Sequence, residues 1–121
     1  MNKVLWIVQG LLAVMFLMAG LMKSTQPKEK LAVKMPWVND YSASSVKLIG
    51  LSQMLAAIGL VVPMLTGIAP VLTPLAASGL GLIMLFAAAY HFRKKEFKEI
   101  GINAVLFALA VFVALGRFGL L

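Results

Sequence analysis

The segment 75–99 changes abruptly from apolar to charged, and this change constrains the fold more than any other feature of the sequence. Residues 75–89 contain only Leu, Ala, Ser, Gly, Ile, Met and Phe, and an aromatic and basic segment follows at 90–96. This transition is typical of a helix that leaves a bilayer, with Tyr90 and Phe92 at headgroup depth and the next basic side chains in water. The segment therefore predicts a membrane protein.

The composition agrees with a lipid environment. Of the 121 residues, 62% are hydrophobic and 12% are charged, whereas soluble domains carry about 25% charged residues. A soluble fold of this size buries only about 60–70% of the surface of its unfolded chain, too little to hide so many apolar side chains. The chain has no cysteine, which excludes disulfides, thiolate metal sites and a cysteine nucleophile.

Four apolar stretches, at about 4–22, 46–65, 74–92 and 100–118, predict four membrane-spanning helices. A helix of this length crosses about 30 Å of hydrocarbon. The predicted fold class is all-α, an integral membrane four-helix bundle in which 1–121 forms a single domain. The alternative for the first stretch is a cleaved signal peptide. It fits less well, because the apolar run is long, lacks an Ala-x-Ala site and is followed by Lys23 as a stop-transfer flank.

The connections carry weaker signals. Pro27 can begin a short interfacial helix between the first two spans, followed by Trp37 as a membrane anchor; the alternative is a solvated loop. Pro63 is expected to kink or stop the second span, and Thr73 to cap the third. Residues 93–100 can continue as helix.

Basic residues are distributed very unevenly between the two sides of such a bundle. Nine of the eleven Lys and Arg residues lie on the side of the first and third connections, namely Lys23, Lys28, Lys30, Lys34, Lys47, Arg93, Lys94, Lys95 and Lys98. The positive-inside rule therefore places the links 23–45 and 93–100 in the cytoplasm and both termini outside. Arg93, Lys94, Lys95 and Trp37 are predicted to contact lipid headgroups, and anionic lipid explains the basic charge better than nucleic acid does.

No Asp or Glu lies inside a span, which disfavours a proton-coupled transporter. The candidate ligand-binding residues are His91, Gln53, Asn103 and Gln9. Gln9 and Gln53 can meet across the first two helices, either as a structural hydrogen bond or as a polar handle in a lipid-like pocket. His91 can ligate haem or a metal, although no second His or Cys supports this, or donate to a quinone carbonyl; the alternative is a histidine that reaches toward water beside Arg93. No catalytic residue and no metal site is predicted.

Several stretches together resemble the DoxX-like family of small four-span membrane proteins. They are Gly20-Leu21-Met22-Lys23 with Pro27, Leu48-Ile49-Gly50-Leu51 continuing to Pro63, Thr66-Gly67, Leu72-Thr73-Pro74, Tyr90-His91-Phe92-Arg93, and Asn103. The resemblance implies a four-helix bundle in the bacterial inner membrane. Named relatives include a subunit of a thiosulfate:quinone oxidoreductase. Relatives often carry a glutamate where this chain has Gln53; if that acid accepts a proton in the relatives, a glutamine cannot replace it in this role.

Three functions remain open at this point. The first is a membrane component that is not itself an enzyme and binds lipid or quinone, or anchors a redox enzyme. The second is a quinone-linked oxidoreductase subunit, and the third is a small-molecule transporter. The sequence leaves the partner open between a redox enzyme and further copies of the chain.

Overall fold

The computed structural model describes all 121 residues, and every regular element in it is helical. The elements are α1 (Asn2–Thr25), α2 (Lys28–Lys34), the 3₁₀ helix η1 (Pro36–Asp40), α3 (Ala43–Thr66), α4 (Leu72–Arg93) and α5 (Phe97–Arg117). The helices α1, α3, α4 and α5 are long and apolar enough to cross a membrane. The prediction of an all-α membrane four-helix bundle is confirmed.

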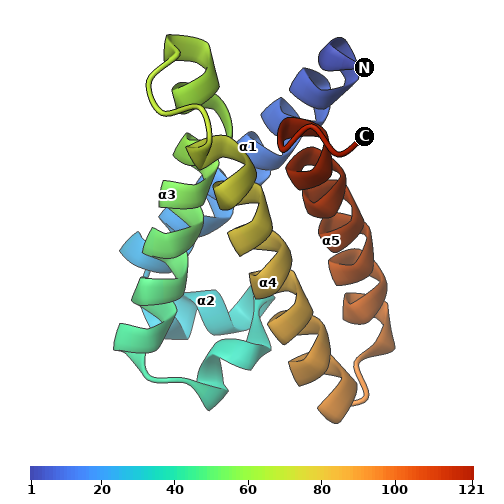
Figure 1. Cartoon of the computed structure of the whole chain (residues 1–121). Coiled ribbons are helices and arrows are strands. Elements are labelled where there is room, and N and C mark those ends of the chain that lie inside the picture. The colour runs from blue at the N-terminus through green and yellow to red at the C-terminus, as the bar shows by residue number, and fades with distance from the viewer.

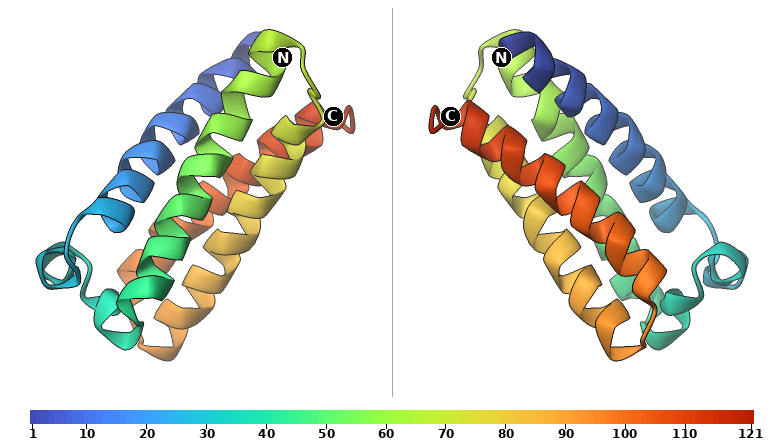
Figure 2. Two further views of the ribbon diagram at one scale, coloured as in Figure 1. Left: turned by 90° about the vertical axis from the view of Figure 1, so that its left-hand side faces the viewer. Right: turned by 90° about the vertical axis from the view of Figure 1, so that its right-hand side faces the viewer.

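The four long helices run up and down, so the chain termini lie at one end of the bundle (Figure 1). We call this the terminal end, and we call the opposite end, which carries α2, η1 and the α4–α5 turn, the basic end. The views in Figure 2 show α2 and η1 lying beside the ends of the long helices. In Figure 1, α3 and α4 are close near their connection and diverge toward the basic end.

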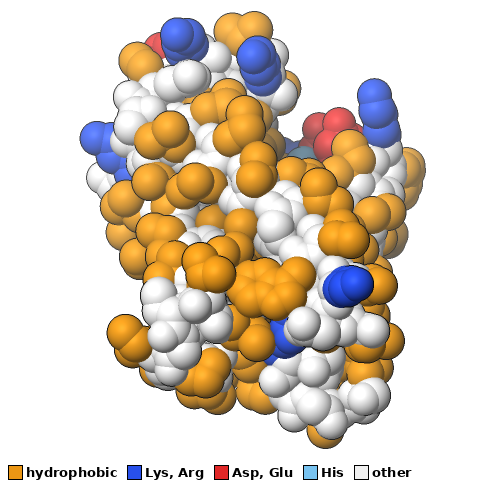
Figure 3. All heavy atoms as spheres, turned by 90° about the horizontal axis from the view of Figure 1, so that it is seen from above, with side chains coloured by type: hydrophobic (Ala, Val, Ile, Leu, Met, Phe, Trp, Pro, Cys, Tyr) orange, Lys and Arg blue, Asp and Glu red, His pale blue; other side chains and the backbone are white.

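Large apolar side chains cover the outside of the bundle as well as its core. Leu12, Leu60, Leu80 and Val113 are fully buried, one from each long helix. Many other Leu, Ile, Val and Phe side chains are exposed on all four helices, and Figure 3 shows hydrophobic atoms over much of the face seen from the terminal end. This surface suits lipid as a solvent, because exposed apolar area on this scale is rare in soluble monomers.

The helices α1 and α3 cross at two glycines. A β-carbon on Gly50 would lie 2.7 Å from the carbonyl oxygen of Gly20, and one on Gly20 would meet the carbonyl oxygen of Gly50. Such close backbone approach supports helix packing in membranes. The helices α4 and α5 also approach closely, since a β-carbon on Gly81 would lie 3.8 Å from the Phe107 ring and 3.9 Å from the β-carbon of Ala110.

Several local expectations were wrong. Pro63 does not stop the second span: it lies inside α3, which continues to Thr66 and is terminated by Gly67 with φ 73°. Thr73 does not cap α4, which begins one residue earlier; its hydroxyl instead donates to the carbonyl of Gly59 at 2.8 Å. The link between α4 and α5 is not continuous helix, because the backbone breaks at Lys95, where φ is 59°.

At the start of α3, Ser42 caps the helix, since its hydroxyl accepts a hydrogen bond from the backbone N–H of Ser45 at 3.1 Å. The expected short helix after Pro27 is confirmed as α2. It packs through Leu31 against Val38 of η1 and Val46 of α3, forming a small second core that holds α2 and η1 against the basic end.

Candidate functional site

A cavity of about 420 Å³ lies at the basic end, between the diverging parts of α3 and α4. Volumes of about 300–1,000 Å³ are usual for small-molecule sites. Most of the lining is hydrophobic, while the polar groups come from four different elements. The lining residues are Lys23, Trp37, Tyr41, Leu48, Ile49, Ser52, Gln53, Ile83, Met84, Phe86, Ala87, Tyr90, His91 and Asn103.

Lys23 is the most unusual of these residues, because it is a buried lysine. It lies in the last turn of α1 and is only 8% exposed. Its Nζ donates to Gln53 Oε1 at 2.8 Å and lies 5.3 Å from the centre of the Trp37 ring. The two ion pairs of the chain, His91–Glu96 and Lys94–Asp40, do not include it. Lys23 is therefore a buried cation without an acidic partner.

The sequence had suggested a flanking role for Lys23 in water. The lysine is buried instead: it lies inside α1, which continues to Thr25, and its ammonium group contacts Gln53 of α3 and the Trp37 ring of η1. The only signal in the sequence was the Trp37 side chain downstream, which was predicted to contact lipid headgroups. The structure places this ring, partly buried, over Lys23 and in the cavity wall.

His91 reaches the cavity from the last turn of α4 and is 9% exposed. Its Nδ1 lies 3.1 Å from Glu96 Oε1, and the Glu96 side chain is 39% exposed. His91 is thus not a histidine reaching toward water beside Arg93. It lies between the cavity and a carboxylate at the surface, an arrangement that can carry a proton between the two.

Asn103 and Gln53 complete the polar lining. Asn103, from α5, is 9% exposed, and its Nδ2 has no hydrogen-bond partner. Gln53, from α3, is almost fully buried, with its oxygen engaged by Lys23. A buried unpartnered donor costs about 1–3 kcal/mol. The wall of the cavity therefore contains an unsatisfied N–H group, which a ligand with an acceptor oxygen could satisfy once the amide turns toward the cavity.

Gln9 lies elsewhere, so the expected contact with Gln53 is wrong. Gln9 Nε2 donates to the carbonyl of Leu60 at 2.6 Å, and Gln9 Oε1 accepts from Arg117 Nε at 2.6 Å. Arg117 also donates to Asn2 and lies over the Trp6 ring. This network joins α1, α3 and α5 near the terminal end and has no part in the cavity.

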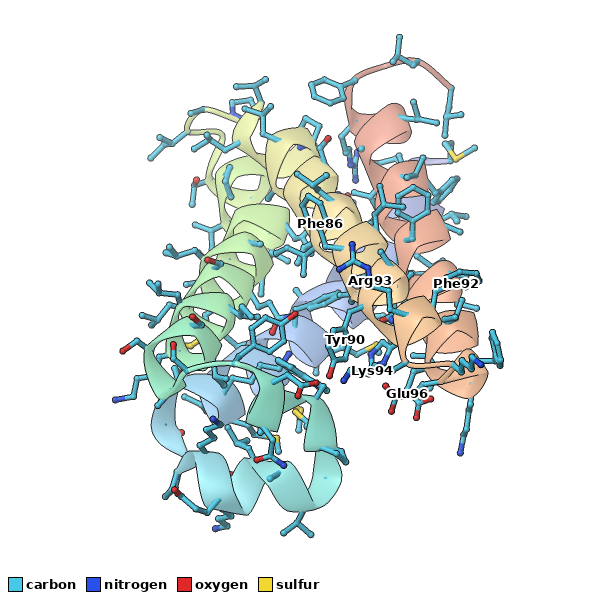
Figure 4. All side chains as sticks on the ribbon, turned by 90° about the horizontal axis from the view of Figure 1, so that it is seen from below. Phe86, Tyr90, Phe92, Arg93, Lys94 and Glu96 are labelled. Atoms are coloured by element: carbon cyan, nitrogen blue, oxygen red, sulfur yellow. The ribbon has the colours of Figure 1, made fainter.

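Side chains of η1 and α4 meet at the cavity wall. The Tyr90 hydroxyl donates a hydrogen bond to Asp40 Oδ2, which also lies 3.3 Å from Lys94 Nζ. The Tyr41 ring lies 5.8 Å from that of Tyr90. Figure 4 shows Tyr90 on the side of α4 that faces η1, with Phe92 on the side toward α5. We call the Asp40–Tyr90–Lys94 contact the latch.

The latch lowers the pKa of Asp40. The Tyr90 hydroxyl is the largest cause, because it donates a hydrogen bond that favours the carboxylate, and Lys94 adds a second hydrogen bond and its positive charge.

Of the residues expected at lipid headgroups, Arg93 and Lys95 are exposed, while Lys94 is partly engaged in the latch.

The four apolar helices, with apolar side chains facing outward on each, define a multi-pass α-helical membrane protein. Within this class, the profile of the DoxX-like family matches residues 7–113, and the chain belongs to the DoxX-like family. Comparisons with curated proteins and with solved structures found no match.

Proposed function

We propose that this protein is a non-catalytic membrane component that binds a lipid-soluble amphipathic molecule, a lipid or a quinone, in the cavity between α3 and α4. One observation carries the proposal: three of the four candidate residues, His91, Gln53 and Asn103, line this one cavity. An apolar lining with a few convergent polar groups is the usual form of a small-molecule site.

The polar groups suit a ligand head group with acceptor oxygens. Lys23 and the free Asn103 amide are donors, and the acceptor oxygen of Gln53 is already occupied. The apolar tail would leave the cavity past Leu48 and Phe86, which line it and are also exposed on the outer surface of α3 and α4. A ligand could then enter sideways from the bilayer without crossing water.

The charge distribution supports an orientation for the protein. With the basic end in the cytoplasm and the termini outside, the positive-inside rule is satisfied in a bacterial inner membrane. Exposed basic residues such as Arg93 and Lys95 would then attract anionic headgroups. The same surface could hold a soluble redox enzyme, which would exchange the ligand at the cavity.

Photoaffinity labelling tests the binding site directly. A long-chain amphiphile with a photoreactive group beside its head would be incorporated into membranes that contain the protein, irradiated, and located by peptide mass spectrometry. Labelling of α3 near Leu48 and α4 near Ala87 is expected. Labelling spread evenly over the lipid-facing residues of all four helices would contradict the proposal, because it would indicate contact with bulk lipid only.

A second candidate function is that of a quinone-linked oxidoreductase subunit. It is favoured by the His91–Glu96 contact, which joins the cavity to the surface and could deliver a proton to a quinone while a partner redox enzyme supplies the electrons that reduce it. Replacing His91 by Ala separates the candidates. Retained binding of a short-chain quinone by the folded variant, together with loss of quinone reduction in membranes that contain it, would favour the oxidoreductase. Quinone binding without any quinone reduction, with or without His91, would favour the non-catalytic component. The transporter alternative gains no support, since no carboxylate lines the cavity.

A further inference from the structure

We infer that the cavity selects an amphiphile with an anionic head group, a carboxylate or a phosphate, and that Lys23 is the counter-ion of that group. The inference rests on the proposed function, because it takes the same cavity as a binding site and specifies the charge of its ligand. It concerns Lys23, which the sequence had indicated only as a basic residue flanking the first membrane span.

The buried ammonium group of Lys23 has no negatively charged partner in the chain. A buried charge is costly unless it is paired and hydrogen-bonded. Lys23 has one neutral hydrogen-bond acceptor, Gln53 Oε1, and the face of the Trp37 ring. Both are electron-rich, but neither carries a negative charge. A ligand oxygen with a formal charge would complete this environment, whereas a neutral carbonyl would leave the cation unpaired.

The cavity contains no carboxylate that would repel an anionic head group or pair with Lys23 in its place. No Asp or Glu lines the cavity. Asp40 is held by Tyr90 and Lys94, and Glu96 faces His91. An anionic head group beside Lys23 would therefore meet no carboxylate in the lining.

The wall of the cavity also holds a hydrogen-bond donor without a partner, on Asn103. Asn103 Nδ2 is buried without a hydrogen-bond partner and belongs to the same lining as Lys23. A carboxylate or phosphate has several acceptor oxygens and can receive hydrogen bonds from two donors at once. A head group beside Lys23 of α1 could thus also receive a hydrogen bond from Asn103 of α5, after its buried amide turns toward the cavity.

The test compares two ligands that share a tail and differ in charge. Dodecyl phosphate and 1-dodecanol would be titrated into the protein in a neutral maltoside detergent. Trp37 fluorescence would report binding in a Trp6→Phe background, because Trp37 lies over Lys23 and Trp6 lies in the Arg117 network. Dodecyl phosphate is expected to bind at least tenfold more tightly than dodecanol.

Two variants should remove this preference, and a third should keep it. Lys23→Met removes the charge at similar length. Gln53→Glu is nearly isosteric and gives Lys23 an internal carboxylate that competes with the ligand, so it also covers the case in which Lys23→Met fails to fold. Lys47→Met is the matched control, because Lys47 is an exposed lysine at the same end of the bundle and does not line the cavity.

The outcomes separate the inference from the function on which it rests. A preference of tenfold or more that is lost in Lys23→Met or Gln53→Glu and kept in Lys47→Met would support the inference. Equal binding of both ligands to the unmodified protein would overturn it and leave the proposed function standing. If neither ligand binds, both are overturned. Displacement of dodecyl phosphate by an equal concentration of inorganic phosphate would also overturn the inference of an amphiphilic ligand, since the tail would then contribute nothing to affinity.

Discussion

Lys23 Nζ donates a hydrogen bond to Gln53 Oε1 at 2.8 Å, and this contact joins the last turn of α1 to α3. Both side chains are buried. The contact therefore has a structural role as well as a place in the cavity wall, and a substitution of Gln53 should affect both stability and binding.

Replacing Gln53 by Leu is expected to lower the free energy of unfolding by about 1–3 kcal/mol, because it leaves a buried ammonium without its only hydrogen-bond partner. Thermal unfolding in detergent, followed by helical circular dichroism, measures the effect. Gln26→Leu is the control, since Gln26 is partly exposed and its side chain makes no hydrogen bond within the chain. An equal effect of the two substitutions would show that the Lys23 contact contributes nothing.

Gln9→Leu should separate stability from binding. It removes a donor to Leu60 and an acceptor for Arg117, so a loss of about 1–3 kcal/mol is expected in the same unfolding measurement. Ligand affinity should stay within about twofold, because Gln9 does not line the cavity. A marked loss of affinity in a folded Gln9→Leu variant would show that Gln9 contributes to ligand binding.

The crossing of α1 and α3 gives a prediction with a control in the same helix. Gly20→Ala inserts a methyl group against the carbonyl of Gly50, and overpacking of this kind costs about 1–3 kcal/mol. Gly10→Ala meets nothing within 4 Å and should stabilise the helix by about 0.5–1 kcal/mol. Unfolding of the two variants side by side checks the sign of each change; a Gly20→Ala variant that is as stable as the unmodified protein would contradict the tight crossing.

The latch predicts a specific titration. Because the pKa of Asp40 is lowered in the folded protein, the contribution of the latch is present above the ordinary value of about 3.9. It is lost as the pH falls through the lowered value in the folded state. Carbonyl-detected NMR should show Asp40 titrating below about pH 3.9. Tyr90→Phe should shift this titration upward, and Lys94→Met should shift it less. An unchanged titration in Tyr90→Phe would exclude the hydrogen bond as its cause.

The long helices could be predicted from sequence because lipid requires a long apolar run for each span. The relative position of the helices could not. Gln9 lies opposite Leu60 in the antiparallel pair α1–α3, and Gly20 lies opposite Gly50. In this register Gln53 is seven residues away from Leu60, the partner position of Gln9, a distance of about 10 Å along a helix. Hydropathy alone does not distinguish this register from one in which the two glutamines meet.

The candidate site was partly predictable, because polar residues stand out in or beside an apolar span. His91, Gln53 and Asn103 were recognised in this way. Lys23 was not recognised, because a lysine that follows an apolar run is usually a flank in water. Its burial depends on η1, whose Trp37 covers it, and a five-residue 3₁₀ helix leaves no periodic pattern in the sequence.

The most direct test of the cavity as a binding site is native mass spectrometry of the protein released from mild detergent. Ala87→Phe fills the cavity, and Ala89→Phe adds the same ring at an exposed position of the same helix that does not line it. The unmodified protein and Ala89→Phe are expected to carry one bound molecule of a single mass, and Ala87→Phe to carry none. The same distribution of bound lipid in all three proteins would contradict a ligand site between α3 and α4.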